Sequence, residues 1–147
     1  MVKFGRGVLA VLAGCLVAAV VMGVVEPVGR LVYPLPPDLD LSKPTDLPKI
    51  ARAMPTGAFA FIIAGWAIGT LIGSSVASKL APDHRPAHGL AVGGLMMASA
   101  VANMVRIPHP TWVWVVGLAL FPPMSFVGAT LGSVDADRSG LGADPAA

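Results

Sequence analysis

Five polar side chains of types that bind or ionise flank the apolar stretches of this chain: Glu26, Arg30, Asn103, Arg106 and His109. Glu26 ends a long apolar run, where a carboxylate is either hydrated at the membrane interface or paired with a base from another helix. Arg30 follows four residues later, a spacing that favours a helical ion pair if the helix continues through Pro27. We expect no catalytic residue, because no nucleophile–base pair is evident and no histidine is expected inside a helix.

The elements that position these side chains are predicted from the distribution of charge. Charged residues make up only 12% of the 147 residues, and mean hydropathy is +0.76, whereas soluble domains carry about 25% charge. Residues 7–25, 53–78, 86–105 and 107–134 contain no charged side chain, and roughly 20 helical residues cross a bilayer. The sequence therefore predicts an all-α integral membrane four-helix bundle, with transmembrane helices at about 7–25, 57–78, 87–105 and 111–133. It is expected to be a single domain over 1–134, followed by a disordered tail at 135–147.

The N-terminal apolar run has two alternative interpretations. Lys3 and Arg6 precede it as in a signal peptide, but the run covers residues 7–25, which is longer than the roughly 7–15 residues of a signal-peptide core. The segment Leu12–Cys15 matches a bacterial lipobox, yet the chain after Cys15 stays apolar. We therefore expect a retained first helix with a small buried thiol.

The only long polar interval is residues 26–55, which holds eight of the eighteen charged residues. Thr45 or Asp46 is a candidate cap for a short helix with Pro48 in its first turn. Apolar residues recur there at helical spacing, which predicts either an interfacial segment or a lid over the bundle. These residues are Leu47, Ile50, Ala51 and Met54.

The sequence predicts no metal site and no cofactor. Asp38 and Asp40 are two residues apart, but hard cations take about six or more oxygen ligands. His84 and His88 are four residues apart, but Pro86 interrupts their helical register, so a solvated loop is expected.

Small residues at four-residue spacing predict close helix packing. The candidate packing residues are Gly65, Gly69, Gly73, Gly89, Gly93, Gly128 and Gly132. Their partner is either another helix of this chain or a second subunit. Pro122 and Pro123 interrupt the fourth apolar run and are a candidate hinge or a structural kink. The carbonyls they free, near Leu118 and Ala119, have Ser125, water or a neighbouring helix as candidate donors.

Alternating membrane crossings place the loop 26–56 and the turn 106–110 at the same membrane surface. An ion pair between Glu26 and Arg106 is therefore our main structural hypothesis. Orientation is weakly determined, because five basic residues fall on each side. Lys3 and Arg6 beside the first helix favour cytoplasmic N- and C-termini.

Several segments together resemble a family of small four-helix bacterial inner-membrane proteins. They are Glu26-x3-Arg30-x2-Tyr33-Pro34-x-Pro36-Pro37, Met54-Pro55, Trp66-x2-Gly69 with Gly73, and Asn103-x2-Arg106-Ile107-Pro108-His109-Pro110-x-Trp112. The position of Arg30 is often histidine in that family. The resemblance covers about residues 5–132 and implies the fold and the bacterial cytoplasmic (inner) membrane, without a biochemical activity.

Two functions remain open. The first is a non-enzymatic membrane protein that associates with itself or serves as an accessory subunit of an unidentified membrane partner. The second is a small transporter or channel that uses a polar site at the end of the bundle, formed by Glu26, Arg106 and His109. The lipid bilayer is the expected surrounding, and the scattered basic residues predict no nucleic-acid partner.

Overall fold

The computed structural model describes residues 2–139 and is built from helices. These are α1 (Val2–Val32), α2 (Leu47–Ala53), α3 (Thr56–Leu80), α4 (Pro86–Arg106) and α5 (Thr111–Arg138). Four of them, α1, α3, α4 and α5, are long and apolar enough to cross a membrane. The predicted all-helical four-helix membrane bundle is confirmed, and the chain is a multi-pass membrane protein.

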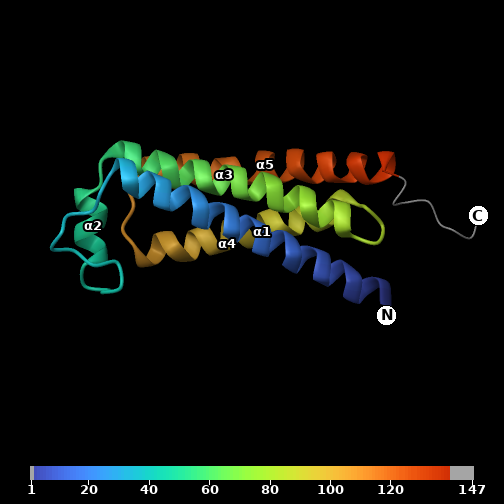
Figure 1. Cartoon of the computed structure of the whole chain (residues 1–147), viewed down its shortest axis with the longest axis horizontal. Helices are drawn as coiled ribbons and strands as arrows, with labels where there is room; N and C mark the ends of the chain where they lie inside the picture. Colours follow the sequence, from blue (N-terminus) through green and yellow to red (C-terminus); the bar gives the residue numbers. More distant parts are fainter. Residues whose placement is uncertain (1, 140–147) are drawn as a thin grey trace, which may run out of the picture.

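The long helices run back and forth. Short connections join α3 to α4 and α4 to α5, whereas a long segment that contains α2 joins α1 to α3. The short helix α2 lies at one end of the bundle, and the start of α1 and the end of α5 lie at the other (Figure 1). α3 packs against α1, α4 and α5. An interior helix of this kind must be narrow, which explains its row of small buried residues.

The glycines of the bundle interior lie at contacts between helices of the same chain. A Cβ added at Gly73 of α3 would lie 2.5 Å from the carbonyl oxygen of Gly14 in α1. Gly89 of α4 is equally close to the Ser74 carbonyl oxygen of α3, and Gly93 faces Ser125 of α5. The predicted packing residues therefore contact internal neighbours. Gly65 and Gly69 of α3 contact α1. Gly128 and Gly132 of α5 contact Leu71 and Ser75 of α3, respectively.

Both proline interruptions lie inside continuous helices. α1 runs through Pro27 to Val32, although the sequence suggested that the helix ends at Glu26. A proline inside a helix removes one hydrogen bond and costs about 3 kcal/mol, a cost that packing after Pro27 offsets. Gly29 packs against Phe61 of α3, and its carbonyl accepts the Tyr33 N–H at 2.8 Å.

α5 likewise continues through Pro122 and Pro123. The Ser125 hydroxyl donates to the Pro122 carbonyl at 3.0 Å. The hydroxyl therefore does not donate to the carbonyls of Leu118 or Ala119, for which the sequence suggested it as a candidate donor.

The C-terminal end of α5 corrects the expected tail. The helix extends through Asp135 to Arg138, and the Asp135 carboxylate forms an ion pair with Lys79 of α3. Charge pairing and packing of the buried Ala136 explain why the helix persists into polar sequence. The rest of the expected tail, 140–147, lies outside the described residues.

A cluster of buried hydrophobic side chains lies in the half of the bundle nearest α2. It combines Phe59, Ile63 and Trp66 of α3 with Ala100 and Met104 of α4, and with Val113 and Phe121 of α5. This cluster packs directly beneath the polar end of the molecule.

Candidate functional site

A pocket of about 160 Å³ lies at the end of the bundle that α2 covers. The end of α1, the start of α3 and the residues around the α4–α5 turn form its walls. α2 contributes Leu47, Ile50 and Ala51, with Met54 just after it, so the apolar face of the short helix closes the pocket. α2 therefore lies as a lid over this end of the bundle, and its place at the membrane interface stays a prediction.

Asp46 is the N-cap residue of α2, and proline occupies the first turn, as the sequence suggested. The Asp46 side chain does not cap the helix. It is buried, accepts the Asp40 N–H at 3.4 Å and pairs with Lys49 at 3.3 Å. These contacts attach the preceding loop to the lid, so loop and lid are positioned together.

Four of the five candidate polar residues line this pocket: Glu26, Arg30, Asn103 and His109. Glu26 and His109 are half-buried, whereas Arg30 and Asn103 are exposed. Arg106 is exposed and does not line the pocket. The structure therefore brings together the polar residues near the ends of α1 and α4 and His109 of the following turn, but not Arg106.

The Glu26–Arg106 ion pair that the sequence suggested is not formed. Within residues 2–139 the ion pairs are Lys49–Asp46, Lys79–Asp135, Arg85–Asp83 and His88–Asp83. Arg106 ends α4 on its exposed side, which explains why its position near the correct membrane surface does not bring it to Glu26.

The aromatic wall of the pocket is the part that sequence reasoning missed. Phe59, Phe61 and Trp66 of α3 line it, and Tyr33 joins them from the end of α1. The Tyr33 and Phe61 rings meet edge to face, with their centroids 6.2 Å apart. The seven-residue spacing of Phe59 and Trp66, two turns of one helix face, was the available signal.

His109 is held in a fixed orientation by its surroundings. Its Nδ1 lies 2.6 Å from the Ile107 carbonyl oxygen, and because a carbonyl only accepts, Nδ1–H is the donor. The ring centroid lies 5.7 Å from that of Phe59 and 6.5 Å from that of Trp66. In the neutral ring, Nε2 is then left as an acceptor.

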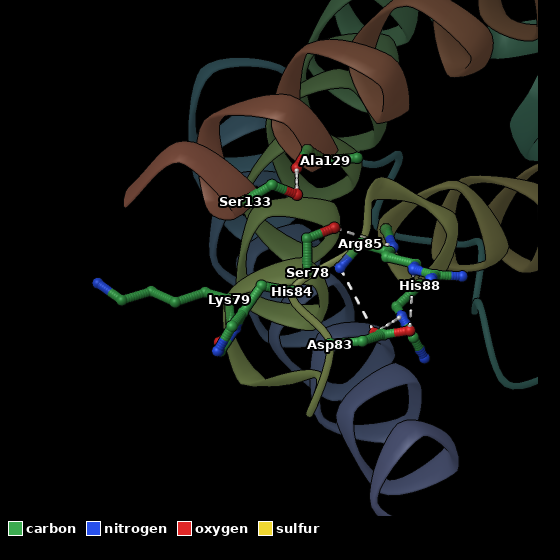
Figure 2. Close-up of polar contacts among 9 residues, drawn as sticks. Ser78, Lys79, Asp83, His84, Arg85, His88, Ala129 and Ser133 are labelled. Carbon is green, nitrogen blue, oxygen red and sulfur yellow. Dashed lines mark hydrogen bonds and ion pairs between the residues drawn. The ribbon is translucent and has the colours of Figure 1, made fainter. Parts of the chain in front are cut away.

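A second polar cluster lies at the opposite end, around the α3–α4 connection. Asp83 lies between Arg85, at 3.5 Å, and His88 Nδ1, at 3.4 Å (Figure 2). His88 Nδ1 is buried and makes no hydrogen bond. Ser78 of α3 accepts the N–H of Gly89 at 3.2 Å and so satisfies a donor in the first turns of α4. These contacts hold the connection between α3 and α4 in place, which is a structural role.

His88 lies in the first turn of α4, so the expectation that no histidine lies inside a helix was wrong. Across residues 2–139 no three His, Cys, Asp or Glu side chains are grouped so that they could hold a metal ion.

Comparison with protein-family models, with curated proteins and with solved structures finds no match to this chain.

Proposed function

We propose that this chain is a non-catalytic membrane subunit that associates, with itself or with another membrane protein, through the outer face of α4. The proposal includes the bacterial cytoplasmic membrane as the location, with the end of the bundle that carries the start of α1 and the end of α5 on the cytoplasmic side. The supporting observation is the unusual composition of the α4 face.

The outer face of α4 exposes small side chains at helical spacing. They are Ala87, Ala91, Gly94, Ala98 and Ala102. A Cβ added at Gly94 would meet no atom within 4 Å, so this face has open space in front of it. Small residues let helices approach closely enough for backbone contact in lipid. The face therefore has the shape of a helix-packing surface without a partner helix from residues 2–139.

α4 also exposes Leu90, Leu95, Met97 and Val105, but on the other outer faces bulky side chains predominate. α1 exposes Leu9, Leu12, Leu16, Val20 and Val24, and α5 exposes Val115, Val116, Phe126 and Leu131. Bulky aliphatic and aromatic side chains are suited to contact with lipid tails. The interior glycines are already occupied by internal helix contacts, which leaves the α4 face as the surface that supports association.

The test compares two glycines that differ only in which face they occupy. Gly94→Leu places a bulky side chain on the α4 face, and Gly23→Leu does so on the exposed face of α1, where a Cβ also meets nothing within 4 Å. Subunits are counted in liposomes, and proteins that co-purify from native membranes are quantified. We expect Gly94→Leu to abolish the oligomer or the fixed-stoichiometry complex and Gly23→Leu to retain it. A wild-type protein that is monomeric and unaccompanied would refute the proposal.

The second candidate function is a small transporter or channel. It is favoured by one observation, the pocket that contains both Glu26 and His109. Charged side chains of the described residues lie toward the ends of the bundle, and the buried polar residues between them, Thr70, Ser74 and Ser125, are neutral. If the wild-type protein in proteoliposomes carries a solute flux and Glu26→Gln abolishes that flux, the transporter or channel function is established over an accessory role.

A further inference from the structure

The pocket beneath α2 has the size of a small-molecule site. Its volume is about 160 Å³, and an apolar protein cavity of about 150 Å³ holds one benzene molecule. Phe59 and Trp66 in its wall are buried, and Phe61 and Ile62 are half-buried. The space fits one aromatic ring or compact alkyl group, which is much less than the two acyl chains of a phospholipid.

Glu26 is a carboxylate in this wall without a partner. It is half-buried, and among residues 2–139 it accepts no hydrogen bond and forms no ion pair within 4.0 Å. Glu26 is not among the side chains whose polar atoms are fully buried, so its carboxylate is reachable by a ligand that enters the pocket. Aromatic and aliphatic side chains form much of the remaining wall, so the group of a ligand that would pair with Glu26 is a positive charge.

Arg30 lines the same pocket and carries such a charge, but it does not supply the compensation. Its side chain is exposed, and it forms no ion pair with Glu26 although the two lie one helical turn apart. Water and salt screen an exposed charge more strongly than a partly buried one. The negative charge of the half-buried Glu26 is therefore less screened within the pocket than the positive charge of the exposed Arg30.

Aromatic rings complete the environment that a cation prefers. Tyr33, Phe59, Phe61 and Trp66 line the space. Ring faces attract ammonium groups, and this attraction is strongest where the site is shielded from water. A carboxylate combined with aromatic rings is selective for an organic cation over an anion or a neutral molecule of the same shape.

We propose that this pocket binds a small organic cation, a protonated or quaternary amine that carries one aromatic or compact alkyl group. The ammonium group lies beside Glu26, and the apolar group lies among Phe59, Phe61 and Trp66. α2 covers the bound molecule with Ile50 and Ala51. This binding activity is separate from subunit association, because the small residues of the α4 face do not line the pocket.

The test uses the full chain in nonionic detergent and isothermal titration calorimetry with two probes. Benzyltrimethylammonium and benzylsulfonate share the ring and differ in the sign of their charge. We expect saturable binding of the ammonium probe and at least tenfold weaker binding of the sulfonate. Absence of saturable binding, or tighter binding of the sulfonate, overturns the proposal.

Variants locate the site. Glu26→Gln is expected to weaken binding of the ammonium probe at least tenfold, while Asp38→Asn, at an exposed carboxylate outside the pocket, leaves binding unchanged. Phe61→Leu keeps an apolar side chain but removes a ring, and a several-fold loss is expected. Helical circular dichroism and elution volume identify a misfolded variant, in which case Phe61→Leu decides the question. Unchanged binding in a folded Glu26→Gln or Phe61→Leu protein overturns the proposal.

Discussion

Asp40 shows how a local turn in the loop before α2 controls a single charge. The N–H and the hydroxyl of Ser42 both donate to Asp40 Oδ1 at 2.8 Å. These bonds, the backbone one first, hold the pKa of Asp40 below its ordinary value of 3.8. Because the folded pKa is lowered, the stabilisation of this turn is fully present above pH 3.8 and is lost as the pH falls through the lowered value.

Removing the Ser42 hydroxyl is therefore expected to raise the pKa of Asp40. In Ser42→Ala the backbone donor remains, so the pKa moves part of the way toward 3.8. Carboxyl carbon chemical shifts followed by NMR during an acid titration measure this change. Ser133→Ala is the control, since its hydroxyl donates to Ala129 within α5. An Asp40 pKa that is not lowered, or that Ser42→Ala leaves in place, would contradict the assignment.

The candidate site shows how far residue types predict a location. Glu26 and His109 were predictable as neighbours, because charge-free windows set the number of crossings and therefore which helix ends meet. The direction of each side chain was not predictable, because it depends on how each helix is rotated about its axis. Arg106 lies on the exposed side of α4 for that reason, while Asn103 reaches the pocket.

At the level of the helices, two glycines allow the effect of helix propensity on stability to be distinguished from the effect of packing. Alanine is favoured over glycine by about 1 kcal/mol in a helix interior. At Gly23, where a Cβ meets nothing within 4 Å, this preference acts alone. At Gly73 the same Cβ would lie 2.5 Å from the Gly14 carbonyl oxygen and 2.9 Å from the Ala18 Cβ. Backbone atoms cannot turn away, so α1 and α3 must separate.

The two substitutions are therefore expected to change stability in opposite directions. Gly73→Ala should lower the free energy of unfolding by about 1–3 kcal/mol, the usual cost of overpacking, while Gly23→Ala should raise it by up to about 1 kcal/mol. Unfolding by a denaturing detergent, followed by circular dichroism in mixed micelles, measures both. Equal effects at the two positions would mean that α1 and α3 do not meet at Gly73.

Helix existence was predictable from composition, whereas helix ends and partners were not. Apolar windows identify segments that must satisfy their backbone groups internally, which in lipid means helices. Proline suggested ends at Glu26, but tertiary contacts of Gly29 and Tyr33 carry α1 on to Val32. The interior glycines lie at close helix contacts, but their spacing contains no information on which of several similar helices lies opposite.

For the whole molecule, the arrangement of the helices predicts which loops share a membrane surface. The loop before α2 and the α4–α5 turn lie at the covered end, and the α3–α4 connection lies at the other end (Figure 1). These segments contain Lys43, Pro108 and Arg85, respectively. In a Cys15→Ala background, Lys43→Cys, Pro108→Cys and Arg85→Cys are each treated with a membrane-impermeant maleimide in sealed vesicles of known orientation. We expect the first two sites to react from one side and Arg85→Cys from the other, with the Lys43 site periplasmic if the termini are cytoplasmic. Reaction of Lys43→Cys and Pro108→Cys from opposite sides would contradict the fold. Reaction of both from the cytoplasmic side would show that the protein has the opposite orientation. Equal numbers of basic residues on the two sides leave only Lys3 and Arg6 to favour cytoplasmic termini.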